Sequence, residues 1–256
     1  MLSNPILVGC GLVASAIPVG VALYATFVPQ SRIWGPTITR GTPPRICLTF
    51  DDGPTPGYTA QVLQILGRAG VPATFFVIGC NAQRSPSLLS EIHAAGHLIG
   101  NHSYDHHHFG LFGGRQYWID KLRRTDDIVA KATGRRPALF RPPIGFKTPF
   151  IFSAVRHTGH TVVTWSVRAF EGRGPSTDLV CQRIATRARP GDIVILHDGT
   201  DPHSPRPHTP EVAIRSLPAV LQQLQSRGLG FTSLDAALGR SAYASISSSA
   251  GAAGTA

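Results

Sequence analysis

The chain has 256 residues, of which 42% are hydrophobic and 15% are charged. This composition fits a folded domain and excludes a wholly disordered chain. The net charge is +10, yet the longest basic runs are pairs, at 123–124 and 135–136, without interleaved aromatic residues. We therefore predict no nucleic-acid partner. The four cysteines show no CxxC spacing, which argues against a disulfide framework and against a thiolate metal site.

The N-terminus carries an uncharged, mostly apolar stretch from residue 5 to residue 28. Its length is enough to cross a bilayer as one helix. We therefore expect residues 1–30 to form a transmembrane anchor or a signal that stays uncleaved. The proline-rich residues 31–44 predict a linker, and the small, polar residues 239–256 predict a disordered tail.

Between residues 45 and 238, short apolar runs alternate with helical patterns. We predict strands at 45–50, 73–78, 97–100, 138–140, 161–165, 192–196 and 231–233. We predict helices at 59–69, 87–95, 115–133, 179–189 and 211–227. This order indicates an α/β fold with a parallel sheet and helical crossovers. With seven or so strands, a barrel is favoured over an open sheet.

Several of these strands end in polar residues. Asp51 and Asp52 follow the first strand, His102 follows the third, and Arg141 and His197 follow later ones. The carboxyl ends of parallel strands line one site. We therefore expect these side chains to converge, although they are far apart in the sequence.

Asp51 and Asp52 are neighbours, and neighbouring strand residues point to opposite faces. Both carboxylates can serve one cleft only where the strand ends. Gly53 and Pro54 supply the turn that ends it. This motif is therefore a candidate pair of catalytic or metal-binding acids.

Two histidines, His102 and His106, are spaced so that they face one ion from the same side of a helical turn. With Asp52 they make a first shell typical of hydrolytic zinc, which leaves positions for water and substrate. His107 and His108 follow directly, so pairs that use either of them stay an alternative.

Arg141 precedes two prolines that hold their loop extended. A guanidinium fixed in this way can clamp a carboxylate through two hydrogen bonds. His197 leaves an apolar strand beside the expected metal site. That position suits a general acid.

Together, four motifs resemble one known family in the right order. They are Thr49-Phe-Asp-Asp-Gly-Pro54, His102-Ser-x-x-His106, Arg141-Pro-Pro-x-Gly145 and Leu196-His197. They resemble the polysaccharide deacetylases with a NodB homology domain, carbohydrate esterase family 4, over about residues 45–238. The resemblance implies a distorted (β/α) barrel of seven or eight parallel strands. It also implies hydrolysis of N-acetyl groups on N-acetylglucosamine units of peptidoglycan, chitin or a related glycan.

The resemblance further implies a role for each matching residue. Asp51 would be the general base, Arg141 would orient it, and His197 would be the general acid. The cofactor would be Zn²⁺ or another divalent cation such as Co²⁺, and its ligands would be Asp52, His102 and His106. The loop that supplies a backbone N–H for the oxyanion would comprise Pro143, Ile144 and Gly145.

The sequence departs from the family at the partner of the catalytic histidine. Arg168 stands where the family usually has an aspartate, so Glu171 or Asp198 would have to replace that carboxylate. A nearby arginine would tend to lower the pKa of His197. Ile144 also stands where the family often has tyrosine. These changes put the substrate in question, but not metal binding.

Two other functions stay open. The Arg168 replacement is compatible with a non-catalytic, membrane-tethered glycan-binding protein, and the apolar N-terminus is compatible with a deacylase of a lipid-linked amino sugar. The arginines after the span, at positions 32, 40 and 45, favour a cytoplasmic location. An envelope glycan requires the opposite orientation. We expect a membrane-anchored protein with its catalytic domain in the periplasm or cell envelope.

Overall fold

The computed structural model describes residues 18–171, 176–204 and 210–244. Seven short strands among these residues form one sheet, in which every neighbouring pair is parallel. In chain order they are β1 (Cys47–Asp51), β2 (Ala73–Val77), β3 (Leu98–Asn101), β4 (Leu139–Phe140), β5 (Thr161–Val162), β6 (Val167–Arg168) and β7 (Ile193–His197). The predicted α/β fold with a parallel sheet is confirmed.

The sheet does not close into a ring. Its order is β5-β4-β3-β2-β1-β7-β6, so β5 and β6 are its two edges although they are consecutive in the chain. Each of these strands has only two residues, and they do not pair with each other. The expected barrel of seven or eight strands is therefore a distorted half-barrel of seven.

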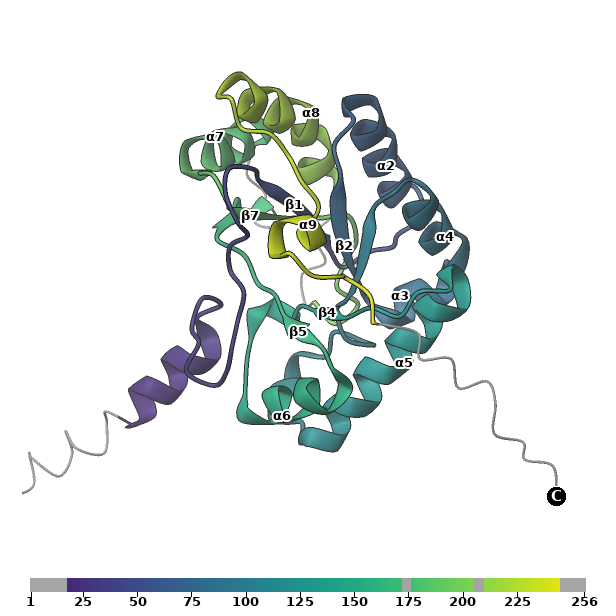
Figure 1. Cartoon of the computed structure of the whole chain (residues 1–256), viewed down its shortest axis with the longest axis vertical. Coiled ribbons are helices and arrows are strands. Elements are labelled where there is room, and N and C mark those ends of the chain that lie inside the picture. Colours follow the sequence, from purple (N-terminus) through teal and green to yellow (C-terminus); the bar gives the residue numbers. More distant parts are fainter. Residues whose placement is uncertain (1–17, 172–175, 205–209, 245–256) are drawn as a thin grey trace, which may run out of the picture.

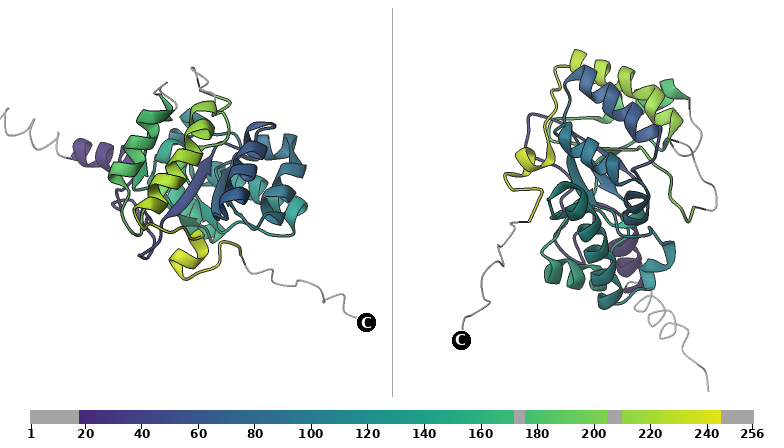
Figure 2. Two further views of the ribbon diagram at one scale, coloured as in Figure 1. Left: turned by 90° about the horizontal axis from the view of Figure 1, so that it is seen from above. Right: turned by 90° about the vertical axis from the view of Figure 1, so that its right-hand side faces the viewer.

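Helices cover the outside of this half-barrel (Figure 1). They are α2 (Tyr58–Ala69), α3 (Gly79–Arg84), α4 (Pro86–Ala94), α5 (Arg115–Thr133), α6 (Pro149–Thr158), α7 (Thr177–Arg187), α8 (Glu211–Ser226) and α9 (Leu234–Leu238). In both views of Figure 2, the yellow-green α8 lies beside the blue α2, which it contacts. The five predicted helices are present, with ends shifted by at most two residues, and α3, α6 and α9 were not predicted.

The alternation of side chains along β1 separates two hydrophobic cores. Leu48 and Phe50 pack outward in the core under the helices, whereas Cys47 belongs to the core inside the half-barrel. Because strand side chains alternate, Thr49 and Asp51 share the inner face with Cys47. This inner row therefore ends in a carboxylate at the carboxyl end of the strand.

The opposite end of the half-barrel is closed by α9 and the residues after it. Leu234 and Ala237 of α9 and the following Ala242 pack into the inner core, and Tyr243 Oη accepts a hydrogen bond from the Ile99 N–H at 3.0 Å. The predicted strand at 231–233 is wrong, since only one isolated bridge forms there. The start of the predicted tail is also corrected, because the buried Ala242 and the partly buried Tyr243 hold residues 239–244 in the domain.

The described N-terminal residues pack on the same domain. Residues 18–27 are helical, and Ala25 is fully buried. Within the predicted linker, Ser31 and Thr37 are buried, so this segment does not behave as a free linker. The predicted membrane span lies largely outside the described residues. No helix in the part of the chain that the structure describes is long and apolar enough to cross a bilayer.

Candidate active site

A cavity opens at the carboxyl ends of the central strands. It is lined by Asp51, Asp52, His102, His106, Ile144, Trp165, Arg168, Ile195, His197 and Asp201. The predicted acids and histidines thus come together from β1, β7 and the loop after β3. Of the remaining predicted residues, Arg141 lies behind Asp51, and Pro143 and Gly145 flank Ile144 in the turn η2 (Pro143–Gly145).

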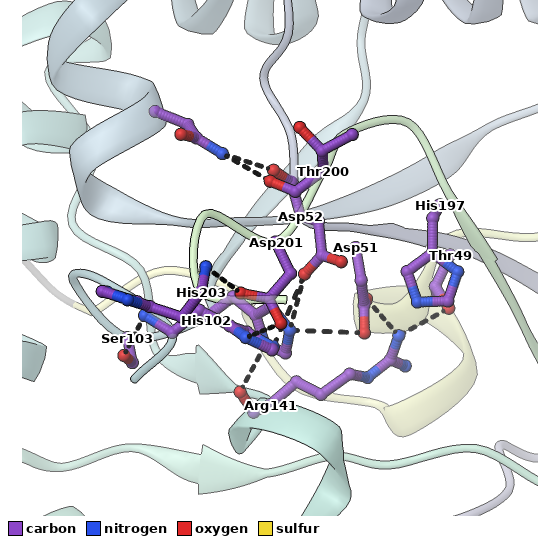
Figure 3. Close-up of polar contacts among 12 residues, drawn as sticks. Thr49, Asp51, Asp52, His102, Ser103, Arg141, His197, Thr200, Asp201 and His203 are labelled. Atoms are coloured by element: carbon purple, nitrogen blue, oxygen red, sulfur yellow. Dashed lines mark hydrogen bonds and ion pairs between the residues drawn. The ribbon is translucent and has the colours of Figure 1, made fainter. Parts of the chain in front are cut away.

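Asp51 is buried and held by Arg141. Its Oδ1 accepts a hydrogen bond from Nη1 of Arg141 at 2.6 Å, and the guanidinium is fully buried. The same guanidinium also donates to Thr49 Oγ1 and to the carbonyls of Val163 and Thr164. Its donors are therefore committed to fixed acceptors, which leaves Asp51 Oδ2 directed toward His102, as Figure 3 shows.

Asp52 turns into the same cavity because the backbone changes direction there. Its φ is 73°, in the left-handed region, so it does not point away from Asp51 as an extended residue would. A carboxylate oxygen of Asp52 lies 3.4 Å from Nε2 of His102 and 3.6 Å from Nε2 of His106. Burial would raise the pKa of Asp52, but His106, His102 and His197 hold it well below its usual range.

Both histidines direct Nε2 toward Asp52. The carbonyl of Arg141 lies 2.7 Å from Nδ1 of His102 and can only accept a hydrogen bond, so Nδ1 carries the proton and Nε2 is free to bind a cation. Nδ1 of His106 lies 3.1 Å from Oδ2 of Asp201, although the contact is poorly aligned for a hydrogen bond. This places a carboxylate behind the second imidazole.

The spacing of the three donor atoms fits a divalent cation. Zinc with bonds of about 2.0–2.1 Å in a tetrahedral shell places its ligands about 3.3 Å apart, close to the two measured separations from Asp52. The three side chains are buried and their donors lie within 4.8 Å of one another. Asp52, His102 and His106 therefore form a candidate metal site.

The loop that carries these histidines is not helical. The expected helical turn is absent, and Ser103 and His106 instead have φ values of 68° and 54°. The Ser103 N–H donates to Asn101 Oδ1 at 2.8 Å, which helps to fix this conformation. His108 does not face Asp52 but lies 2.5 Å from Asp201 Oδ2. His107 packs against His203 with ring centroids 4.6 Å apart, so the structure favours the pair His102 and His106.

His197 faces the cavity from β7 and has a carboxylate partner. Its Nδ1 lies 2.7 Å from Oε1 of Glu171, which is buried. Asp198, the other candidate partner, instead accepts a hydrogen bond from Thr59 Oγ1 at 2.6 Å. Burial would lower the pKa of His197, but the negative charge of Glu171 raises it to about 9.

Arg168 lies at the end of β6 and also lines the cavity. Its guanidinium packs over the ring of Phe170 at 4.4 Å and over that of Trp165 at 5.6 Å. The lowered pKa expected for His197 is wrong, because Glu171 is in direct contact and outweighs the arginine. Burial would raise the pKa of Glu171, but the positive charge of His197 and, to a smaller extent, that of Arg168 lower it.

The turn after Arg141 places Ile144 against the cavity. Ile144 has φ 57° and lines the cavity. The N–H groups of Gly145 and Phe146 donate to the carbonyls of Pro142 and Pro143. Within the described residues, the Ile144 N–H donates to no acceptor, so it is available to a substrate oxygen.

Comparisons with known proteins agree with this geometry. A family model described as polysaccharide deacetylase matches residues 39–163. A peptidoglycan-N-acetylglucosamine deacetylase of Bacillus cereus is 32% identical, over 74% of this chain and 85% of its own length. The chain belongs to the polysaccharide deacetylase family. A chitooligosaccharide deacetylase of Sinorhizobium fredii is 33% identical, over 70% of this chain and 80% of its own length.

The fold of this family member also matches a solved structure. A family 4 carbohydrate esterase from Streptomyces lividans, in complex with acetate, superposes with a TM-score of 0.65 at 32% identity. The match covers 73% of this chain and 91% of that protein. This deacetylase domain therefore carries the NodB-type fold.

The left-handed residues of this deacetylase cluster at the cavity. Among the residues that the structure describes, five other than glycine have positive φ, and three of them, Asp52, His106 and Ile144, line it. Each such conformation costs about 1–3 kcal/mol and persists only where the surroundings enforce it. Since each one turns a functional group inward, the strain is consistent with a site built for chemistry.

Sequence reasoning missed Asp201, which lies behind His106. The signal was a carboxylate four residues after His197 in a polar loop. Burial would lower the pKa of His106, but Asp52 and Asp201 raise it. A carboxylate behind a metal-ligating imidazole orients the ring and increases its basicity.

Asp201→Asn is expected to weaken zinc binding about 10- to 100-fold, because it removes the negative charge behind His106. The measurement is a competition titration of the purified protein against a zinc chelator. Asp120→Asn, an exposed position on α5, is the matched control and should bind zinc as the parent does. An unchanged dissociation constant for Asp201→Asn would remove Asp201 from the metal site.

Proposed function

We propose that this chain hydrolyses N-acetyl groups on N-acetylglucosamine units of a cell-envelope or chitin-like polysaccharide, using a divalent cation such as zinc. The observation that carries the proposal is the placement of Asp51. It is buried, held by Arg141, and 3.7 Å from Nε2 of a candidate metal ligand, His102. A base in this position can take a proton from a water beside the cation.

When bound, a divalent cation supplies Lewis acidity, which makes a water molecule deprotonate near neutral pH. Asp51 accepts that proton, and Arg141 holds its carboxylate in one orientation during the transfer. The Ile144 N–H donates to the oxygen that becomes negative as the acetamide carbonyl is attacked. Asp51 and Ile144 both line the cavity, and Arg141 lies behind Asp51.

His197 acts from β7 as the general acid. The amine of the sugar leaves readily only when it is protonated. Glu171 keeps His197 protonated by raising its pKa to about 9. The buried Glu171 thus takes the place of the aspartate that the family usually has at position 168.

The proposal is tested by acetate release. The full chain, supplied with zinc or cobalt, is incubated with acetylated chito-oligomers and with peptidoglycan, and acetate and the deacetylated glycan are measured. We expect turnover on at least one of these glycans. Binding without release on all of them would favour the non-catalytic glycan-binding function. Release only from a lipid-linked amino sugar would instead identify such a sugar as the substrate.

Glu171→Gln is expected to shift the alkaline limb of kcat/KM to lower pH by about one to two units. Activity requires protonated His197, and removing the negative charge lowers the pKa at which that proton is lost. The measurement is a pH profile of kcat/KM beside that of Glu91→Gln, an exposed position on α4. Coincident pH profiles would show that Glu171 does not control the pKa of the general acid.

We also propose that the apolar N-terminus holds the catalytic domain at a membrane, outside the cytoplasm. The support is the uncharged stretch at 5–28 and an envelope glycan as substrate. Alkaline phosphatase fused after Gln30 should be active in cells, because this reporter folds only where disulfides form. An inactive fusion, expressed at normal levels, would place the domain in the cytoplasm.

A further inference from the structure

The end of the N-terminal helix and the residues just after it pack on the loop at 143–147, which carries the Ile144 N–H. We call residues 26–30 the N-terminal clamp; it comprises the last two residues of the helix at 18–27, drawn in purple in Figure 1, and the three residues that follow. The Thr26 carbonyl accepts a hydrogen bond from the Lys147 N–H at 3.1 Å. The rings of Phe27 and Phe146 meet edge to face, with centroids 4.8 Å apart. The clamp lies outside the predicted catalytic domain, yet it touches the loop that carries the oxyanion donor.

Lys147 ties this loop to the clamp through a buried charge. It is fully buried, and its ammonium donates to the carbonyls of Val28 at 2.9 Å and Pro29 at 2.6 Å. Burial lowers the pKa of Lys147 to about 8. A buried ammonium is tolerated only when its donors are satisfied, so the loop and the clamp depend on each other.

The clamp also contacts the segment that follows β5. Thr164 Oγ1 donates to the Pro29 carbonyl and Gln30 Nε2 donates to the Trp165 carbonyl, both at 3.0 Å. The Thr164 carbonyl in turn accepts from Arg141, the residue that holds the catalytic base. Trp165 lines the cavity. The clamp therefore links two walls of the active site.

Close packing at Gly145 shows how tightly the three segments meet. Gly145 has φ 78°, and a Cβ at this position would lie 2.7 Å from the Trp165 ring and 3.0 Å from Pro29. Ile144, the residue before Gly145, also has a left-handed backbone conformation. The position of the Ile144 N–H is thus set by the clamp and Trp165 together.

We propose that the N-terminal clamp is a positioning element of the active site, which holds the Ile144 N–H and Trp165 in place for turnover. The proposal rests on the proposed deacetylase function. A loosened clamp misplaces the oxyanion donor but leaves Asp52, His102 and His106 undisturbed. Turnover and metal binding are therefore expected to respond differently.

The test is Lys147→Met in the full chain, which removes the ammonium and keeps a side chain of similar length. We expect kcat to fall about 10- to 100-fold, while the zinc dissociation constant stays within about threefold of the parent's. Amide hydrogen exchange should become faster at 143–147 and stay unchanged at 98–106. Lys131→Met, at an exposed position on α5, is the matched control and should behave as the parent.

Phe27→Ala is a second variant for the case that Lys147→Met does not fold. Phe27 is 42% exposed, so its truncation should disturb folding less than a change at the buried Lys147. Phe27→Ala should also lower kcat while leaving zinc affinity unchanged, and its loss of kcat should be smaller than that of Lys147→Met. Unchanged kcat and unchanged amide exchange of the loop in the folded variant would overturn the proposal that the clamp positions the active site. Equal losses of zinc affinity and kcat would also overturn it. A parent that releases no acetate, with loop exchange still faster in the variant, would overturn only the proposed function.

Discussion

Asp51→Asn is expected to reduce kcat for acetate release about 10²- to 10⁴-fold, the contribution of a positioned general base. The amide of asparagine keeps the shape of the carboxylate and can still accept from Arg141, but it cannot take a proton from water. Asp52, His102 and His106 are unchanged, so the variant should bind zinc as the parent does. Steady-state kinetics and a zinc titration on the same preparation measure both quantities.

The control for this variant is Asp178→Asn, in the first turn of α7 and away from the cavity. It should leave both quantities unchanged. Full turnover by Asp51→Asn would show that another group is the base. Loss of zinc together with turnover would instead assign Asp51 to the metal shell, where its Oδ2 already lies 3.7 Å from His102.

Removal of the cation is expected to lower kcat about a thousandfold or more, because its Lewis acidity contributes several kcal/mol and each 1.4 kcal/mol is a factor of ten. Dialysis against a chelator, followed by titration with zinc or cobalt, should restore turnover with one ion per chain. The metal content is checked by elemental analysis at each step. Chelated protein that is free of metal and fully active would contradict a metal-dependent reaction.

His102→Gln separates this effect from a general action of the chelator. The variant loses an imidazole whose Nε2 faces Asp52, so it should need a higher zinc concentration for half-maximal activity. His157→Gln, on the far helix α6, is the matched control. Equal zinc requirements for both variants would exclude His102 as a ligand.

Much of the site could be predicted because its residues stand at strand ends. Parallel strands bring their carboxyl ends together, and the Gly53-Pro54 turn explains why Asp52 follows Asp51 into the same cavity. The resemblance to the family then assigned a role to each residue. Glu171 was one of two candidate partners for His197, and only the structure, through the 2.7 Å contact, distinguishes it from Asp198.

The features that escaped prediction depend on long-range packing. The residues at 231–233 look like a strand because Phe231 and the β-branched Thr232 follow Gly230, but only the isolated bridge from Phe231 to Ile46 forms there, and the helix α9 begins directly afterwards at Leu234. Tyr243 lies in a small, polar sequence and is fixed by long-range contacts, which are the hydrogen bond to β3, a bridge to Pro137 and packing against the inner core. Asp201 and the N-terminal clamp carry no motif, and their roles follow from what they touch. Local sequence therefore identified the chemistry, whereas tertiary contacts identified what holds it in place.

X-ray absorption at the zinc edge of the zinc-loaded full chain tests the central claim most directly. We predict nitrogen and oxygen ligands at about 2.0–2.1 Å, with outer-shell scattering from two imidazoles in the parent and from one in His102→Gln. A sulfur ligand at about 2.3 Å would contradict the account. An imidazole contribution unaltered by that substitution would contradict it equally.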